Sequence, residues 1–506
     1  MKNLNKKGIS LIIAIAIMLI CSVLGVVMAQ LLGVTSRGSV DYLRSAQAFG
    51  ITQGGMNWYK MLLAGTSDWD TTTNQTGLTF GPGTFDVALS NKVAPYADST
   101  TATRMDVNVT GKVAGSSGVT IQRMMVERIL KLPSACKFAL FWGRELGSTL
   151  TLTNTTIDGD FWSIGSTSIP GGSSVINGKA YRPSGENISG GVAYTEQPIT
   201  YDVNFGYFGN NDATFSPTVS TPSFTTTYYS NLITTYTNML SLGNSGRCSP
   251  SSGTITLNGS NNIVCNNDFN TNGNLTITGT GFIIAKRDIL LHSENNDSGT
   301  LNIVPAGGPI VFISDDNFTV GGASNQTNQP VNVSANTRMF CRSNGDNDVM
   351  NIRNANTAIS GALILANRQV IIQNGADVNG STLFLADNGN SSANYVRITG
   401  SGTTIGTVAN PSSVISLASS SGSPSALTID ASATAAGLFY QREASGTNGK
   451  TRINTATIRG TVIADGLQGN AITSSTITYD EQAITDPPPE GFNLFVTKKA
   501  NSWSGN

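Results

Sequence analysis

The chain has 506 residues, a formal net charge of −1 at pH 7 and only 12% charged residues, about half the share typical of soluble domains. This balance excludes the basic stripe of a nucleic-acid-binding surface, and the length exceeds that of one ordinary domain. Serine, threonine, asparagine and 55 glycines supply the polar content. Such a composition is typical of extracellular β proteins with many turns.

An apolar run from Gly8 to Leu32 follows three lysines and precedes the next charge at Arg37. It supplies the roughly 20 apolar residues that a helix needs to cross a bilayer, where the backbone must satisfy its own hydrogen bonds. The lysines predict a cytoplasmic N-terminus and an exported remainder. We expect membrane or helix-bundle contacts from Leu11, Ile13, Leu19, Leu24 and Leu31.

Three interpretations of this helix remain open. It is a secretory signal peptide cut after Val27-Met28-Ala29, or a plain signal anchor, or a prepilin segment. The third interpretation rests on Lys7-Gly8-Ile9-Ser10-Leu11, which resembles a type IV prepilin leader. In that family a prepilin peptidase cuts after the glycine, here Gly8, and methylates the new N-terminus, here Ile9, so residues 1–8 are the expected leader.

Helical spacing continues beyond the apolar run, over Ser36–Gly65. Arg44-Ser45-x-Gln47-Ala48-Phe49, with Gly54-Gly55-Met56-x-Trp58, is similar to the PilX-type minor pilins. The resemblance implies one helix over residues 9–65 that packs among other pilins and meets the pilus assembly machinery. Most pilins carry Glu at the fifth mature position, where this chain has Ile13. PilX-type subunits also lack that Glu, which implies a minor or tip subunit.

Residues 66–133 change to a period of two, as in Phe85-x-Val87-x-Leu89 and Met105-x-Val107-x-Val109. This alternation predicts a meander of about three half-buried antiparallel strands. Its apolar face is expected to cover part of the helix. Pro133 marks the expected boundary of this pilin-like sheet.

Residues 134–485 contain short β-rich runs that recur every 20 to 30 residues or so, which is typical of a solenoid. Gly281–Leu291, for example, is echoed by Ala362–Ile372. The fold class predicted is therefore mainly β, with a right-handed parallel β-helix after the helix and sheet. A β-sandwich is the alternative. The repeat is expected to open near Thr149–Leu152 and Gly159–Trp162.

Two segments depart from the repeat. Residues 223–242 place Tyr228, Leu232 and Tyr236 at helical steps, which predicts a short helical excursion that caps an open end or forms a binding lobe. Residues 486–506 begin with Pro487-Pro488-Pro489, which cannot join a sheet interior. We expect a C-terminal strap along the surface.

Cys21 lies in the apolar run, and the other four cysteines lie in the part expected to be exported, where disulfides form. Cys248 and Cys265 are close enough in sequence to close a short disulfide loop, which leaves Cys136 and Cys341 as the remaining pair. The chain has no CxxC motif and its single histidine is His292. These residues give a zinc site almost no ligands.

Two groups of residues are candidates for a catalytic or metal-binding site. Lys286, Arg287 and Asp288, with Asp315 and Asp316, form a candidate acid/base group for a polysaccharide lyase or hydrolase. Asp346 and Asp348 lie among oxygen ligands at calcium-like spacing, although Asn and Asp are also ordinary turn residues. We therefore expect no catalytic residues and no cofactor, with calcium as the weak candidate.

These features together predict a minor or tip subunit of a type IV pilus. It would lie in the inner membrane before assembly and on the surface pilus afterwards, with roles in priming, adhesion or contact with host or surface glycans. The first alternative is a membrane-anchored or secreted β-helix enzyme that degrades polysaccharide. The second is a type II secretion pseudopilin.

Overall fold

The computed structural model describes residues 4–64, 72–93, 104–115, 118–130, 136, 138–143, 149–163, 165–170, 174–181, 187–190, 195–196, 226–243, 248–292, 299–322, 330–343, 345, 347–386, 394–418, 425–441, 450–464, 466–480, 483–484 and 499–504. Strands make up 51% of the residues that the structure describes, so the mainly β class is confirmed. The chain divides into two compact units. One comprises Met1–Ala94, Ser99–Lys131 and Val496–Asn506, and the other comprises Pro95–Asp98 and Leu132–Phe495.

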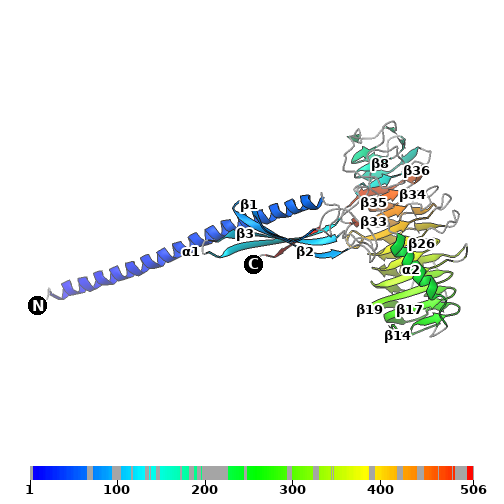
Figure 1. Ribbon diagram of the computed structural model, residues 1–506, viewed down its shortest axis with the longest axis horizontal. Coiled ribbons are helices and arrows are strands. Elements are labelled where there is room, and N and C mark those ends of the chain that lie inside the picture. Colours follow the sequence, from blue (N-terminus) through cyan, green and yellow to red (C-terminus); the bar gives the residue numbers. More distant parts are fainter. Residues whose placement is uncertain are drawn as a thin grey trace. The chain divides into compact units, whose positions relative to one another are not determined.

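The first unit combines one long helix with an antiparallel sheet (Figure 1). The helix, α1, runs without a break over Leu4–Ala64. The sheet has the strand order β1-β2-β3-β4-β38. Its strands are β1 (Gln75–Phe80), β2 (Gly83–Val93), β3 (Arg104–Ala114), β4 (Thr120–Leu130) and β38 (Lys499–Ser504). The period-two alternation thus builds four consecutive strands, one more than the meander of about three that it predicts.

The fifth strand corrects the expectation for the C-terminus. Residues 499–504 do not form only a strap, because β38 pairs antiparallel with β4, with Trp503 opposite Met125. The open edge of β4 offers unpaired backbone groups that a returning segment can satisfy. The three prolines of the predicted strap lie outside the described residues. The second unit is therefore inserted, in chain order, between two neighbouring strands of one sheet.

The second unit consists of parallel strands that pair in three rows, two of them within one 21-stranded sheet. In the first row, neighbours in the following order are hydrogen-bonded. The row comprises β14 (Gly253–Asn258), β17 (Leu275–Ala285), β19 (Leu301–Ser314), β21 (Val331–Val333), β24 (Thr357–Ser360), β27 (Asp377–Asn379), β30 (Thr404–Ile405), β33 (Thr434–Gln441), β35 (Thr457–Ala464), β37 (Thr476–Tyr479), β7 (Thr156–Asp158) and β10 (Val175–Ile176).

The second row shares the long strands β17, β19, β33 and β35 with the first, which joins the two rows into one sheet. Its other members are β15 (Ile263–Cys265), β22 (Thr337–Cys341), β25 (Leu363–Ala366), β28 (Thr382–Leu385), β31 (Ser412–Ser416), β5 (Leu140–Trp142), β8 (Phe161–Ser163), β11 (Lys179–Tyr181) and β13 (Thr195–Glu196). The echo between residues 281–291 and 362–372 reflects this row, because β17 and β25 occupy equivalent places in it.

The third row is a separate 12-stranded sheet. It comprises β16 (Phe269–Asn270), β18 (Ile289–Leu291), β20 (Phe318–Val320), β23 (Met350–Arg353), β26 (Gln369–Gln373), β29 (Tyr395–Thr399), β32 (Leu427–Asp430), β34 (Thr451–Asn454), β36 (Leu467–Thr473), β6 (Leu150–Thr153), β9 (Thr167–Ile169) and β12 (Ile188–Gly190). Alternate residues of the three rows, such as Ile277, Phe312 and Ile352, are fully buried and share one core.

The order of the strands along the rows shows that the repeat does not begin where the sequence predicts. Residues 149–152 and 159–162 do not begin the stack of strands. Instead, β5 pairs with β35 and β8, and β7 pairs with β37 and β10. The early strands therefore lie beside the late ones, which Figure 1 shows as the cyan β8 near the orange β34 and β36. The first row begins with β14, which is in the middle of the chain and pairs with β17.

A second helix, α2 (Thr226–Met239), lies on the outside of the second row (Figure 1). The ring of Tyr229 stacks on Phe384 of β28, with 4.1 Å between ring centroids, and Tyr236 contacts Phe340 of β22 at 5.8 Å. The helical excursion is thus confirmed. The expectation that it caps an open end is wrong, because outward-facing aromatic residues of the row give its tyrosines a lateral surface to bury.

Candidate functional site

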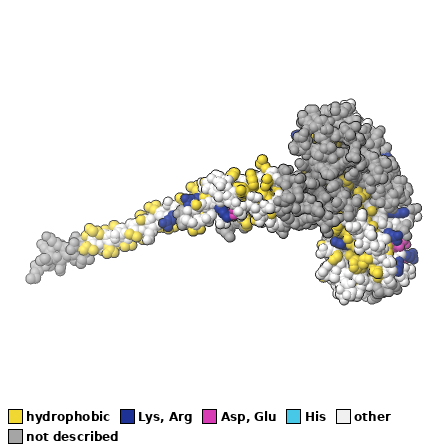
Figure 2. Space-filling view, viewed as in Figure 1, with side chains coloured by type: hydrophobic (Ala, Val, Ile, Leu, Met, Phe, Trp, Pro, Cys, Tyr) yellow, Lys and Arg dark blue, Asp and Glu magenta, His cyan; other side chains and the backbone are white. Residues whose placement is uncertain are grey.

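The first half of α1 exposes apolar side chains along its length. Exposed fractions at Ile13, Leu19, Leu24 and Leu31 lie between 53% and 61%, and Figure 2 shows these side chains as a yellow surface. Among the described residues this is the one helix long and apolar enough to cross a membrane. Gly8, Ile9 and Leu11 lie in α1, but their side chains are outside the described part.

Polar side chains in and beside this half bond to the backbone of their own helix. The hydroxyl of Ser22 donates to the carbonyl of Leu19 at 2.9 Å, and that of Thr35 donates to the carbonyl of Leu31 at 2.9 Å. Such bonds remove the need for water as a partner. This half of α1 is therefore suited to hydrocarbon or to a bundle of similar helices.

One face of the second half of α1 is buried against the antiparallel sheet. Ala48, Tyr59 and other residues pack against Val107 and Val109. The approach is close at several glycines: a Cβ atom on Gly55 would lie 2.7 Å from the ring of Phe85, and one on Gly111 would lie 2.4 Å from the carbonyl oxygen of Ala48. The glycines thus permit close packing, a role that helix propensity alone does not reveal.

Polar contacts also fix this helix on the sheet. The hydroxyl of Thr52 donates to the carbonyl of Arg123 at 2.9 Å and accepts from the amide of Gly111 at 3.1 Å. Lys60 of α1 forms an ion pair with Glu127 of β4, which is buried. One helix therefore presents two environments, an exposed apolar half and a half anchored on the sheet.

The cysteines form one disulfide. Cys248 and Cys265 are bonded, with their Cα atoms 5.7 Å apart. Cys136 and Cys341 are buried free thiols, so the remaining pair does not form. Burial raises the pKa of the Cys341 thiol to about 11, and burial likewise raises the pKa of Cys136. Neither thiol is a reactive nucleophile at neutral pH.

The candidate acid/base residues lie at the turns between the second and third rows. Asp315 forms an ion pair with Arg342 at 2.8 Å, and Asp288 accepts from both the backbone and the side-chain amide of Asn317 at 3.0 and 3.1 Å. Asn317 in turn accepts from the amide of Val349 at 3.0 Å. These contacts form a ladder of turn residues from one strand level to the next.

Asp316 is the exception among these carboxylates. Burial, with the nearby carboxylates of Asp348, Asp315 and Asp288, raises the pKa of Asp316, and Arg287 partly opposes this rise. Arg287 itself lies 3.7 Å from Asp268. The fold brings together residues that the sequence marks as candidates, but their contacts are those of stacked turns.

The calcium candidates fall only partly within the described structure. Asp346 lies outside the described residues. The carboxylate of Asp348 accepts a hydrogen bond from the amide of Gly345, as turn residues often do. Among the described residues, no group of three or more His, Cys, Asp or Glu side chains is arranged to hold a metal ion.

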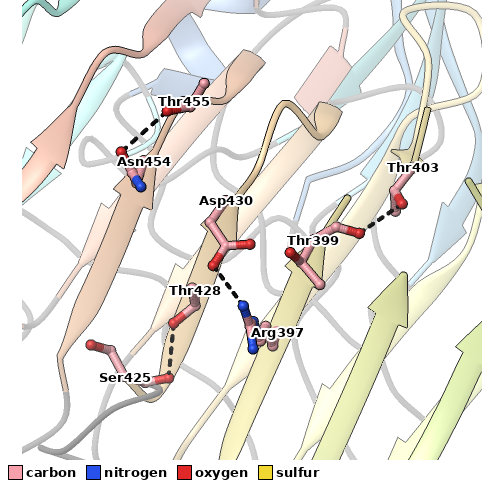
Figure 3. A network of polar contacts seen from close by, with 8 residues as sticks. All are labelled: Arg397, Thr399, Thr403, Ser425, Thr428, Asp430, Asn454 and Thr455. Carbon is pink, nitrogen blue, oxygen red and sulfur yellow. Dashed lines mark hydrogen bonds and ion pairs between the residues drawn. The ribbon is translucent and has the colours of Figure 1, made fainter. Parts of the chain in front are cut away.

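The three rows have different outer surfaces. That of the second row is apolar and buried, as Phe340 and Phe384 under α2 illustrate. The third row carries polar contacts, shown in Figure 3. There the guanidinium of Arg397 in β29 lies 3.2 Å from the carboxylate of Asp430 in the neighbouring strand β32, and Thr455 donates to the side chain of the preceding residue, Asn454, at 3.2 Å.

The first row presents a file of short polar side chains that we call the threonine face. Each member pairs with the next in register. The file is Thr254, Thr276, Asn302, Asn332, Ala358, Asp377, Thr404, Thr434, Thr457, Thr476 and Thr156. Seven of these eleven residues are threonine, and none is buried. At about 4.8 Å per strand the file extends for roughly 48 Å.

The threonine face is ordered by its own side chains. Asn332 donates to Asn302 at 2.9 Å, and Thr434 lies 3.4 Å from Thr404 between their hydroxyls. Threonine is restricted at χ1 by its branched Cβ atom, so a rigid sheet holds its hydroxyl groups in fixed places. Sequence reasoning missed this face, although alternation such as Leu275-Thr-Ile-Thr278 signals it.

No protein-family model, no curated protein and no solved structure matches this chain.

Proposed function

We propose that this protein is a minor or tip subunit of a type IV pilus. The observation that carries the proposal is the division of α1, an unbroken helix with an exposed apolar first half and a second half anchored on an antiparallel sheet. A cleaved signal peptide has no use for this continuity. The apolar half crosses the inner membrane before assembly and joins the helices of other pilins afterwards.

Processing gives the sharpest test of this proposal. Prepilin peptidase would cut after Gly8 and leave a methylated Ile9, whereas a secretory signal peptidase would leave Gln30 as the first residue. Mass spectrometry of the mature protein separates these outcomes. Recovery of the chain from sheared filaments is the second requirement, and a mature protein that begins at Gln30 contradicts the proposal.

The position in the filament follows from Ile13. A carboxylate at this position would be costly in hydrocarbon unless it were paired, and isoleucine makes no such pair with a neighbouring N-terminus. The chain is therefore suited to a minor position rather than to the repeating lattice. Deletion of the gene should reduce piliation or attachment, whereas a secretion defect with normal pili would instead identify a type II secretion pseudopilin.

The parallel strands form the displayed head, which we propose to be a right-handed parallel β-helix. Three rows of in-register parallel pairs around one shared core support this fold. Parallel strands joined by crossovers are right-handed in about 98% of cases. A β-sandwich, by contrast, is built mostly from antiparallel pairs.

The threonine face is the proposed contact surface for host or surface glycans. It offers hydroxyl and amide groups with almost no charge, which complements a neutral, hydroxyl-rich ligand. Its length and rigidity suit an extended chain rather than a single sugar. Two of the turn carboxylates, Asp315 and Asp288, are engaged with Arg342 and Asn317, so binding without cleavage is the activity that these contacts favour.

Glycan binding by the full chain in detergent tests this surface. Thr434→Glu places a charge in the middle of the threonine face and should lower retention on neutral glycans at least several-fold. Thr234→Glu makes the same change at an exposed site on α2 and should leave retention unchanged. Equal binding by both variants would remove the face from the proposal, and cleavage of the glycan would favour the polysaccharide-degrading alternative.

A further inference from the structure

One edge of strand β14 faces away from the stack of parallel strands. The amides of Gly253 and Gly259 point inward and donate to the carbonyls of Asn274 and Thr280 at 2.9 and 2.7 Å. Residues alternate in direction along a strand, so the backbone groups of Thr254, Thr256 and Asn258 point outward. Among the described residues, the pairing of β14 is with β17, on its inner edge.

The side chain of Asn261 occupies part of this edge. Its Oδ1 atom accepts from the amide of Asn258 at 2.8 Å, and its Nδ2 atom donates to the carbonyl of Thr256 at 2.8 Å. One residue of a further parallel strand would make the same two bonds, because its N–H would donate to the carbonyl of Thr256 and its C=O would accept from the amide of Asn258. The carboxamide therefore takes the place of the backbone N–H and C=O of one residue in a neighbouring strand.

The loop that carries Asn261 is fixed from both sides. Asn258 Oδ1 accepts from the amides of Ser260 and Asn261, each at 3.0 Å, and Gly259 turns with φ at +79°. The disulfide between Cys248 and Cys265 joins the two ends of the segment that contains β14 and this loop. The carboxamide is thus held at the edge by a closed loop.

We propose that Asn261 is an edge cap that prevents two copies of this chain from pairing through β14. The occupant of an uncapped edge is a second copy, because identical edges related by a two-fold axis meet as antiparallel strands that complement each other. Charge does not oppose this pairing, since Gly253–Asn258 contains no ionisable side chain. The role is separate from the proposed pilus function and concerns the head alone.

The test measures the protein mass of the full chain in detergent micelles by light scattering. Asn261→Ala should double the mass of the wild-type species at high protein concentration. The matched control is Asn332→Ala, which removes an exposed asparagine from inside the same row, where its side chain bonds to Asn302 of the neighbouring strand, and it should keep the wild-type mass. An unchanged mass for folded Asn261→Ala, or an equal rise in the control, overturns the proposal.

Two further variants keep the test decisive. Asn261→Asp keeps the acceptor for Asn258 and loses the donor to Thr256, so it should associate less strongly than Asn261→Ala. Adding Thr254→Pro to Asn261→Ala removes an outward amide and places a ring at the edge, which should restore the wild-type mass. If Asn261→Ala does not fold, association of Asn261→Asp still supports the cap, and its absence counts against the cap. Association that persists with Thr254→Pro assigns the interface to another surface.

Discussion

Individual carboxylates in this protein differ in their hydrogen-bond partners and in the charges around them. Asp86 in β2 accepts from the side chain of Lys112 and, at 2.8 Å, from the amide of Gly77. The Lys112 ammonium group and the Gly77 amide lower the pKa of Asp86. Asp316 has the opposite surroundings, because burial and neighbouring carboxylates raise its pKa. The contributions of these two carboxylates to folding stability should therefore change with pH in opposite directions.

Asp86→Asn should destabilise the helix-and-sheet unit at pH 7 by about 1 kcal/mol or less, as befits a partly exposed ion pair. Because the pKa of Asp86 is lower in the folded state, its contribution is complete above the unfolded value of about 3.9 and is lost as pH falls through the folded value. Thermal unfolding from pH 7 to pH 2 should show wild type and variant converging in acid. Lys112→Ala should reproduce the loss, and parallel profiles would contradict this account.

Asp316→Asn should stabilise the parallel-strand unit at pH 7. The raised pKa of Asp316 means that its charged form is less favourable in the folded state, so wild type loses stability as pH rises from the unfolded value through the folded one. The gain in the variant should therefore be present at neutral pH and absent in strong acid. Asp315→Asn, which breaks the ion pair with Arg342, should not stabilise the unit.

Individual elements depend on surfaces that lie far away in sequence. Helix α2 has no charged side chains and meets the second row through stacked rings, so its place is set by aromatic packing. Helical steps in the sequence predict the helix itself. They do not predict its partner, because Phe384 and Phe340 acquire a common outward direction only once their strands have stacked.

Phe384→Ala should lower the free energy of unfolding of the parallel-strand unit by about 3–5 kcal/mol, the range for a buried phenylalanine. Tyr229→Ala should lower it as well. A double-mutant cycle should give a coupling of about 0.5–1.5 kcal/mol for the stacked pair. Denaturant unfolding measures these values, with Thr234→Ala as the exposed control, and strict additivity would show that the rings do not interact.

At the scale of the molecule, local patterns and long-range pairing differ in how well sequence predicts them. The repeated Phe-Ile-Ile-Ala and Leu-Ile-Leu-Ala runs indicate equivalent strands, because each must bury the same face. Nothing local indicates that Leu140 pairs with Val462, or that residues 499–504 add a strand to β4. Those pairings depend on which edges remain open after the neighbouring segments have folded.

Hydrogen exchange of the full chain checks this order of strands. Val462→Asp places a charge at a fully buried position of β35 and should first remove protection from its neighbour Leu140–Trp142 in β5. Ile277→Asp is an equally buried change in β17 and should first affect Leu301–Val304 of β19 instead. Equal early loss in β5 for both variants would contradict the nearest-neighbour order.

The joining of early and late strands has a consequence for how the protein is made. The hydroxyl of Thr461 donates to the carbonyl of Phe138 at 2.6 Å across 323 residues, so β5 cannot complete its ladder until the ribosome has nearly finished the chain. During synthesis, Leu140–Trp142 of β5 are therefore made long before their partner residues in β35, and one edge of β5 stays unmatched for that time. A factor that shields this edge until β35 has been made should raise the yield of the folded parallel-strand unit.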